Sequence, residues 1–575
     1  MADGDFTTNG RRLGILLALA LALGALAGGI AFLLLRLIGL ITNLAYDGRL
    51  STALVSPSLG HLGPLTVAIP VAGGLVVGGI ARYGTDKVRG HGIPEAIQAI
   101  LEDGSRMTAR VAFWKPIASA ITIGTGGPFG AEGPIIMTGG AVGSLVAQRF
   151  PLSSMERRTL LVAGAAGGMA ATFGAPVSAV LLAVELLLFE WRPRSLVPVA
   201  GAAAVAYMVR VLLLGGAPIF HTLSLPVTPV RLLPLCLGIG LLAGLVSGLL
   251  TKAVYLVEDL YPRLALPWMW WPALGGLVVG LGGLVAPAAL GVGYPTIRAL
   301  DAGQIALGAA LALLVVKAVI WVISLSSGTS GGVLAPLLLM GGALGAAFGA
   351  LLPGQDIALW ATVGMAAMLG GTMRAPFTAT IFTLETTHDL GVLTAVFLAS
   401  IAAMTVTVLW LPRSILTEKV ARRGVHVARE YGTHPLEAVG VAEIMVPWAH
   451  LRAIAPWATV EAATGSLADS PLAARIEPPP APGVLPGIVS AAAVRTNPAG
   501  PEKVRPVAAP ERPLGRIAVT ARARAAVEAM ARTGVAVLLV TEKDGTPVGI
   551  VRQVDLLKAW RRHLAEEEDR SRPSP

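Results

Sequence analysis

The sequence is poor in cysteine and in charged residues, and each shortage narrows the kind of protein it can encode. Its one cysteine, Cys236, excludes an intrachain disulfide and a cysteine-based metal site. Only 14% of the residues are charged, whereas 54% are hydrophobic and the mean hydropathy is +0.72. A chain of 575 residues with this balance is too apolar for a soluble globular protein, so we expect a membrane protein.

The net charge of +10 does not point to a nucleic-acid partner, because basic residues flank the apolar part of the chain. Arg11 and Arg12 precede the first long apolar run, and Lys419, Arg422 and Arg423 follow the last. Basic flanks favour the cytoplasmic side of a bilayer. We therefore expect a multi-pass protein of the inner cell membrane with both termini in the cytoplasm, and no nucleic-acid partner.

Apolar runs recur from residue 13 to residue 411, and they are of two kinds. Those long enough to cross a bilayer include Leu13–Leu35, Leu232–Leu250, Trp268–Leu290 and Ile305–Leu325. The first is too long for the core of a signal peptide, so we interpret it as a retained span. Others are short or broken by glycine and proline, including Pro134–Val146, Gly332–Leu344 and Ala375–Leu384. Irregular backbone at membrane depth needs surrounding protein or a water-filled cavity, so the broken segments predict a transport site.

The apolar part contains one pattern twice. Gly73–Gly78 returns as Gly275–Gly280, and Lys115 returns as Lys317, both at an offset of 202 residues. The other pairs, in the same order, are Gly92-Ile93-Pro94 with Gly293-Tyr294-Pro295, Gly130–Pro134 with Gly332–Pro336, Gly139–Ala141 with Gly341–Ala343, and Ala175-Pro176 and Glu185 with Ala375-Pro376 and Glu385. The series predicts a duplication, with repeats at about 65–190 and 267–390 and a transport site between them. Spacing alone does not say whether the repeats are inverted.

The stretch Gly124–Pro134 places a carboxylate between glycines and a proline, directly before an apolar segment. Glycines disfavour a helix and Pro134 suits the first turn of one, so a helix should begin here. The unpaired N–H groups and the positive dipole end of that helix form an anion site. Glu132 would compete with a mobile anion for the N–H groups at the start of the Pro134 helix, as a gate does. The alternative is that Glu132 only compensates the helix dipole.

The composition changes after Leu411, and the C-terminal part has the pattern of an α/β domain. From residue 514 we predict a strand opening at Ala518-Val519, a helix at Ala521–Thr533, strands at Ala536–Thr541 and Pro547–Arg552, and a helix at Val554–His563. The charged tail, residues 564–575, is expected to be disordered.

Together these motifs resemble those of the CLC family of chloride channels and proton-coupled chloride exchangers. The resemblance covers residues 13–424 and rests on Gly90–Pro94, Gly130–Pro134 and Gly332–Pro336. It implies an all-α polytopic membrane domain of two inverted repeats with broken and tilted helices, assembled as a homodimer in the lipid bilayer. The C-terminal part resembles a cytoplasmic α/β pair of CBS domains at 439–496 and 507–563, joined by a linker at 497–506. Residues 1–12 would form a cytoplasmic N-terminus.

The resemblance also assigns the site residues. Glu132 would be the gate, and the anion would contact His91, Gly92, Ile93, Gly130, Ala131, Gly133, Gly332, Val333, Leu334 and Leu416. Dehydrating an anion costs on the order of 20 kcal/mol, whereas one helix end contributes only about 0.3–2 kcal/mol, so several helix ends must converge. The three motifs contain no Lys or Arg, which suits an ion that must also leave.

Four positions depart from the family pattern. His91 replaces a serine; it could donate a hydrogen bond to the anion, gain a charge in acid, or simply face solvent at a helix start. Ala131 replaces a basic residue, which predicts a less positive vestibule, and Leu416 replaces a tyrosine, which predicts a weaker inner constriction. Leu186 replaces the second, proton-passing glutamate of the exchangers. Its neighbour Glu185 would either belong to a proton path with Glu132 or cap a helix.

The predicted function is chloride-selective anion transport gated by Glu132, with protons as a second cargo if the protein is an exchanger. Channel and exchanger both remain open, and Leu186 favours a channel or a weakly coupled exchanger. The alternatives are a CLC-type fluoride exporter and, in another class, an intramembrane enzyme with Glu132 and His91 as acid and base. No cofactor or metal is expected. An adenine nucleotide at Asp555 is the one exception, but Arg552 replaces the usual Thr or Ser there, which favours a structural role.

Overall fold

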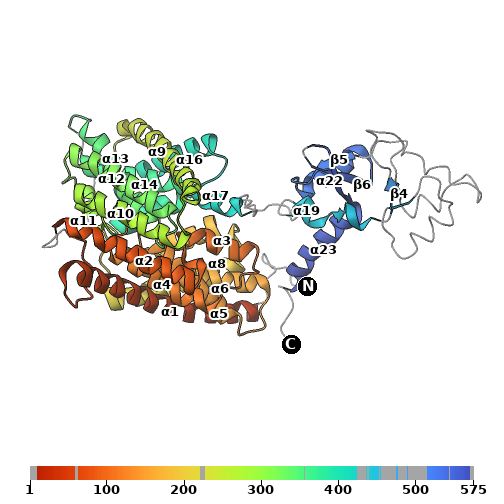
Figure 1. Ribbon diagram of the computed structural model, residues 1–575, viewed down its shortest axis with the longest axis horizontal. Helices are drawn as coiled ribbons and strands as arrows, with labels where there is room; N and C mark the ends of the chain where they lie inside the picture. The colour runs from red at the N-terminus through yellow and green to blue at the C-terminus, as the bar shows by residue number, and fades with distance from the viewer. Residues whose placement is uncertain are drawn as a thin grey trace, which may run out of the picture. The chain divides into compact units, whose positions relative to one another are not determined.

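The computed structural model describes residues 10–57, 63–220, 227–354, 356–423, 436, 439–451, 453–454, 474–476, 488–489, 515–542 and 544–569 (Figure 1). The chain divides into two units, Met1–Tyr431 with Arg570–Pro575, and Gly432–Asp569. Each unit is described by itself below.

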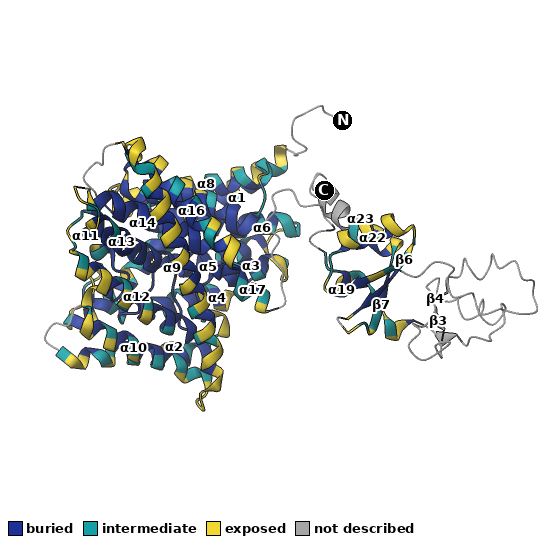
Figure 2. Cartoon of the chain, turned by 90° about the horizontal axis from the view of Figure 1, so that it is seen from above, coloured by how far each residue is buried: buried dark blue, intermediate teal, exposed yellow. Residues whose placement is uncertain are grey.

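The first unit is built of helices. They are α1 (Gly10–Thr42), α2 (Ala68–Tyr83), α3 (Ile93–Leu101), α4 (Ala109–Gly124), α5 (Glu132–Ala147), α6 (Ser154–Phe173), α7 (Pro176–Leu182, continued as a π-helix over Ala183–Leu188), α8 (Pro193–Leu214), α9 (Leu233–Leu260), α10 (Trp271–Val285), α11 (Tyr294–Asp301), α12 (Leu307–Ser326), α13 (Leu334–Ala350), α14 (Ile357–Met373), α15 (Pro376–Thr387), α16 (Leu393–Trp410) and α17 (Ile415–Arg422). The most completely buried of them, α5, α6, α13 and α14, form the interior (Figure 2).

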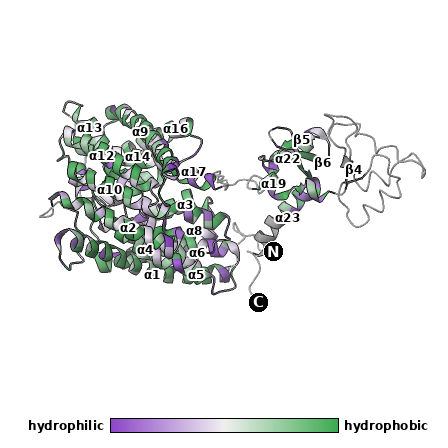
Figure 3. Cartoon of the chain, viewed as in Figure 1, coloured by the Kyte–Doolittle hydropathy of each residue, from purple (hydrophilic) through white to green (hydrophobic). Residues whose placement is uncertain are grey.

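Among the described residues, seven helical segments are long and apolar enough to cross a membrane (Figure 3). They are Gly10–Asp47, Gly63–Tyr83, Pro193–Leu214, Val230–Arg263, Trp268–Val285, Leu307–Ser326 and Leu390–Arg422. Each of the four long spans predicted from the sequence overlaps one of these segments, although the segment that begins at Trp268 ends at Val285, before the predicted end at Leu290. Shorter apolar helices, such as Leu334–Ala350, lie between them, as the broken apolar runs indicated.

The two repeats are inverted, which the sequence spacing left open. A methyl group at Gly74 would lie 2.4 Å from the carbonyl oxygen of Pro272, and one at Gly276 would lie 2.2 Å from that of Pro70. Such reciprocal contacts require a two-fold relation between α2 and α10. Further along α2, Gly78 meets Met269, so the partner number falls as the α2 number rises. The two helices therefore run antiparallel.

Two buried lysines hold equivalent loops in the two repeats. The Lys115 ammonium donates hydrogen bonds to the carbonyl oxygens of Val88 (2.8 Å) and Gly90 (2.7 Å), just ahead of α3. Lys317 donates to two loop carbonyls ahead of α11, both at 2.8 Å. Both lysines are fully buried. Each repeat therefore uses the same device to fix the approach to a helix that starts inside the protein.

The two ends of the membrane unit lie on the same face. Arg12 pairs with Glu156 at the start of α6, and the residue after Glu156 donates to the carbonyl oxygen of Gly104. Gly104 closely follows α3, and Gln98 of α3 accepts a 2.5 Å hydrogen bond from Arg423. This chain of contacts places the start of α1 and the end of α17 together, as termini on one side of a membrane require.

The second unit contains a four-stranded sheet in the order β1-β7-β6-β5, in which β5 and β6 are parallel and the other neighbours antiparallel. Its elements are α19 (Val441–Ile444), β1 (Val446–Pro447), β5 (Gly515–Ala518), α22 (Ala523–Thr533), β6 (Val537–Thr541), β7 (Pro547–Arg552) and α23 (Gln553–Asp569). A second sheet joins β2 (Ala453–Ile454), β3 (Ala474–Ile476) and β4 (Ile488–Val489). The predicted order of strand, helix, strand, strand and helix after residue 514 is confirmed.

The last helix of the C-terminal part is longer than the sequence predicts. The helix α23 continues to Asp569, so the first part of the tail at 564–575, expected to be disordered, is helical. The alanine and glutamates of residues 564–569 are good helix formers. The prediction of disorder gave more weight to the charge of the segment than to this helix propensity. Residues 570–575, most of the predicted first module at 439–496 and the linker at 497–506 lie outside the described residues.

Candidate anion site

Two of the three glycine motifs meet across the two-fold relation between the repeats. The N–H of Gly332 donates to the carbonyl oxygen of Gly130 (2.8 Å), and the N–H of Gly130 donates to that of Gly332 (3.2 Å). The two glycines occupy equivalent positions in the two repeats. The helices that follow them, α5 and α13, therefore begin on either side of one point, with their unpaired N–H groups close together.

The Glu132 carboxylate lies at this point and is fully buried. Its Oε1 accepts hydrogen bonds from the backbone N–H groups of Leu334 (2.5 Å) and Ala335 (3.2 Å), at the start of α13. Its Oε2 has no hydrogen-bond partner among the described residues. The sequence reading had placed this carboxylate on the helix of Pro134 in its own repeat, and that assignment was wrong. The inverted packing brings the other repeat's helix end to Glu132, and spacing along the chain does not reveal such a contact.

The glycines of the motifs leave room for this arrangement. A methyl group at Gly130 would lie 1.8 Å from Oε2 of Glu132, and one at Gly332 would lie 2.5 Å from its Cδ. A methyl group at Gly92 would lie 2.5 Å from the carbonyl oxygen of Gly133, and Gly92 also has φ of +92°. A larger side chain at Gly92 would push α3 away from α5, and one at Gly130 or Gly332 would displace the Glu132 carboxylate. The glycines therefore bring all three helix starts together.

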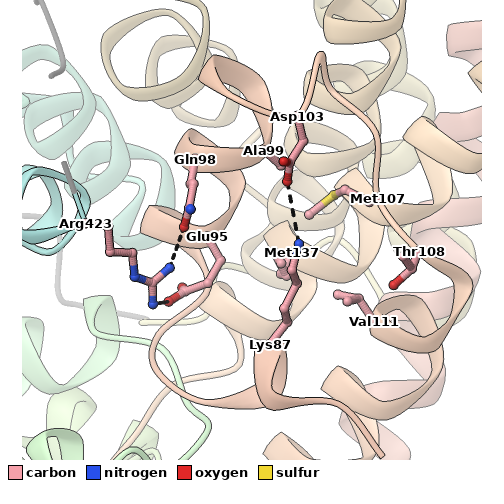
Figure 4. A pocket seen from close by; sticks show the side chains of 10 residues that line it. All are labelled: Lys87, Glu95, Gln98, Ala99, Asp103, Met107, Thr108, Val111, Met137 and Arg423. Atoms are coloured by element: carbon pink, nitrogen blue, oxygen red, sulfur yellow. Dashed lines mark hydrogen bonds and ion pairs between the residues drawn. The ribbon is translucent and has the colours of Figure 1, made fainter. Parts of the chain in front are cut away.

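The start of α3 is partly occupied by its own side chain. The N–H of Gly92 donates to the Glu95 carboxylate (2.9 Å), which also pairs with Arg423 (3.4 Å) and Lys419 (3.9 Å). Glu95 and Arg423 line a small cavity of about 30 Å³, together with residues of α3, α4, α5 and the loop between α3 and α4 (Figure 4). This cavity lies on the face that holds both ends of the membrane unit, and we refer to it as the inner mouth.

His91 is buried, with 2% of its surface exposed, so the reading in which it faces solvent is wrong. Its carbonyl oxygen packs against Gly133, and its Nδ1 has no partner among the described residues. Burial, the largest effect, disfavours a charged imidazole, and so do Lys419 and Lys115, whereas the Glu95 carboxylate favours it. Because burial dominates, we expect a neutral His91. Its contact with the anion stays a prediction.

The other predicted anion-site residues are buried as well. They are Ile93, Ala131, Val333, Leu334 and Leu416. Leu416 lies in the first turn of α17, where the carbonyl oxygen of its neighbour Ile415 accepts a hydrogen bond from the Tyr255 hydroxyl. A role for Leu416 at an inner constriction stays a prediction.

The sequence reading missed one tyrosine in this region. Tyr294 begins α11, and its buried hydroxyl has no hydrogen-bond partner among the described residues. Its ring makes edge contacts with Phe220 and Phe173, with centroids 5.8 and 6.5 Å apart, and the phenol interacts electrostatically with Glu132. The sequence did contain a signal for Tyr294. It aligns with Ile93 in the other repeat, so the two copies of the motif differ by a tyrosine in place of an isoleucine.

Comparison with known proteins agrees with this geometry. The family model described as voltage gated chloride channel matches residues 73–408, more than half of the chain. The chain belongs to the CLC family. It is 33% identical over 323 residues to the H(+)/Cl(-) exchange transporter ClcA of Klebsiella pneumoniae subsp. pneumoniae, an alignment that covers 54% of this chain and 68% of that protein.

The fold is shared with solved CLC structures. A slow cyanobacterial Cl-/H+ antiporter superposes with a TM-score of 0.63 at 21% identity, covering 71% of this chain and 97% of that one. A CLC-type fluoride/proton antiporter superposes with a TM-score of 0.61 at 23% identity, covering 71% and 98%. Because this fold occurs with either anion, the fold by itself does not select chloride.

Away from the anion site, this CLC chain uses Glu185 as a helix cap. Its carboxylate accepts hydrogen bonds from the N–H (2.8 Å) and the hydroxyl (2.5 Å) of Thr378, at the start of α15. Glu385, its repeat equivalent, accepts from the N–H groups of Val177 (2.9 Å) and Ser178 (2.7 Å), at the start of α7. Each glutamate thus caps a helix of the opposite repeat. A part for Glu185 in proton transfer stays a prediction.

In the second unit, Asp555 is held by Arg552. The carboxylate accepts hydrogen bonds from the Arg552 backbone N–H (3.1 Å), Nε (2.8 Å) and Nη2 (2.5 Å), so both of its oxygens are used. A nucleotide ribose would have to displace this partly buried ion pair to reach Asp555. Arg552, which replaces the Thr or Ser of the CBS pattern, thus binds the Asp555 carboxylate that would contact the nucleotide in that pattern.

Proposed function

We propose that this CLC protein exchanges chloride for protons across the membrane, with Glu132 as both the gate and the proton-carrying group. The observation that carries the proposal is the pair of α13 N–H groups held by the Glu132 carboxylate. These donors, at a helix start, are the groups that a dehydrated anion requires. The identity to a protein named as an H(+)/Cl(-) exchange transporter supports chloride and protons as the cargo.

The exchange follows from competition for these donors. The charged carboxylate makes charge-assisted hydrogen bonds, which are roughly twice as strong as neutral ones, and so keeps chloride out. Protonation removes that charge and weakens the hold of α13 on Glu132. Chloride then takes the N–H groups while the carboxylic acid moves away with its proton. When the proton leaves on the opposite side, the carboxylate returns and displaces chloride.

The inner half of the proton route distinguishes this chain from a strongly coupled exchanger. Leu186 is fully buried at the position of the second glutamate, and Glu185 is committed to Thr378. We propose that protons reach Glu132 from the inner side by a slower route, so that fewer protons move per chloride. We also propose a homodimer in the inner membrane, with both termini in the cytoplasm. The placement of Arg12 and Arg423 on one face supports the position of the termini on one side.

The test is flux from proteoliposomes that contain the purified protein, with chloride, fluoride and internal pH recorded in the same vesicles. An outward chloride gradient should drive measurable proton uptake, and chloride should leave faster than fluoride. Chloride efflux without proton movement would identify a channel instead. Fluoride efflux many times faster than chloride efflux would identify a fluoride exporter.

A further inference from the structure

A buried hydroxyl without a partner is costly, and the Tyr294 hydroxyl is one. Its oxygen is excluded from solvent and forms no hydrogen bond with the described residues, and the residue as a whole is only 6% exposed. Most buried polar groups in proteins are satisfied, so an unsatisfied one calls for an explanation. The ring packing does not require the oxygen, because Phe173 and Phe220 contact the ring and a phenylalanine would preserve both contacts.

A second unsatisfied buried atom belongs to the same electrostatic environment. Oε2 of Glu132 also has no partner among the described residues, and Glu132 and Tyr294 interact electrostatically. The cations that act on this pair are Arg210, Arg298 and Lys317. All three donate hydrogen bonds to backbone carbonyl oxygens, which fixes their positions. Tyr294 therefore offers an unpaired donor within the electrostatic range of a carboxylate that has one oxygen without a partner.

Tyr294 also lines a cavity on the face opposite the inner mouth. This outer cavity, of about 100 Å³, is lined by Tyr294, Arg298 and the far end of α1 at Thr42, together with Ser56 and with apolar and glycine residues. Its lining includes the cation Arg298 and no acidic residue, whereas the inner mouth is lined by Glu95 and Asp103 as well as by Lys87 and Arg423. A carboxyl group leaving α13 toward this side would meet a donor and a positive field rather than a competing acid.

We propose that Tyr294 is a gate-positioning residue, whose hydroxyl donates a hydrogen bond to the Glu132 carboxyl group once chloride has taken the N–H groups of α13. The inference rests on the proposed function of Glu132 and adds the place where the displaced gate is received. The closed state leaves the hydroxyl unpaired and the open state pairs it, so the contact favours opening. Chloride binds only the open state, and its apparent affinity therefore rises with the open fraction.

The experiment is chloride titration by calorimetry of the purified full-length protein and its Tyr294→Phe variant at one pH. Loss of a hydrogen bond that only the open state makes should weaken apparent chloride affinity on the order of threefold to tenfold. Tyr46→Phe is the matched control, because Tyr46 is also buried and its hydroxyl donates to the Thr125 carbonyl oxygen rather than lacking a partner. The control should leave chloride affinity unchanged.

The same substitution in a Glu132→Ala background decides how Tyr294 acts. With no carboxyl group to receive, Tyr294→Phe should have no effect on chloride affinity there. An equal effect in both backgrounds would mean that the hydroxyl serves the anion or the fold directly, and would overturn the proposal. So would unchanged affinity in the otherwise native protein. Failure of the native protein to exchange chloride in vesicles would refute the proposed function instead, and is measured separately.

Discussion

The two repeats carry the same residues where they hold the backbone and different residues where the helix ends meet. Lys115 and Lys317 make matching bonds in the two halves, and Glu185 and Glu385 each cap a helix of the opposite repeat. At the two-fold point, however, Glu132 is matched by Leu334 at the same offset of 202 residues. Duplication therefore supplies two helix starts that face each other, and only one of them carries a carboxylate. This difference leaves one carboxylate at the meeting point of two helix starts, where it accepts hydrogen bonds from the N–H groups of α13.

The difference between the two repeats is tested most directly by removing the charge of Glu132, since the matching residue Leu334 carries none. Glu132→Gln resembles the protonated gate, so chloride flux should persist and become largely independent of pH. The native protein should carry chloride faster as pH falls, because protonation releases the carboxylate from α13. Proton movement driven by a chloride gradient should fall to the background of empty vesicles. A folded Glu132→Gln protein that keeps the native pH dependence would rule out the gate.

The symmetric lysines should matter for stability and to the same degree. Lys115→Met and Lys317→Met each strip two buried carbonyl oxygens of their charged donor, at a cost of about 3 kcal/mol. We expect both variants to lose thermal stability in detergent by similar amounts, followed as the monodisperse peak after heating. A large loss in one variant with none in the other would show that the two loops are not equivalent supports.

The capping glutamates test whether position 185 is more than structural. Glu185→Gln and Glu385→Gln should each lower the free energy of unfolding by about 1 kcal/mol, as the loss of a helix cap does. Both should leave proton coupling close to native, because each caps a helix start away from the gate. If Glu185→Gln alone abolishes chloride-driven proton uptake, Glu185 belongs to the proton path.

The smallest effect is expected in the second unit, where Asp555 offers the opposite case to Glu132. One oxygen of Glu132 is unpaired, whereas both oxygens of Asp555 are held by Arg552. We expect no adenine nucleotide binding to the full-length protein in a fluorescent-analogue titration. Arg552→Ser serves as the comparison, since it frees the carboxylate. Saturable binding to the native protein would show that the ion pair opens for a ligand.

Much of the site was within reach of the sequence, because the motifs are local. Glycine, proline and carboxylate within Gly130–Pro134 predicted a helix start with an anion at it, and the matched series of motifs predicted two repeats. Glu132 lies where the two helix starts meet, and its role at an anion site stays a prediction. Its partner was assigned to the wrong helix, because the hydrogen bonds to Leu334 and Ala335 join residues that are more than 200 positions apart.

The membrane class, the duplication and the three motifs follow from the amino-acid sequence, since hydropathy and glycine spacing are properties of short segments. The three-dimensional packing was needed to establish that the repeats are inverted, that Glu132 is held by α13, that Glu185 and Glu385 cap each other's repeat, and that Tyr294 lies in the electrostatic range of Glu132. These features depend on how the two halves pack. Packing across a two-fold relation brings together residues whose separation along the chain carries no sign of their contact.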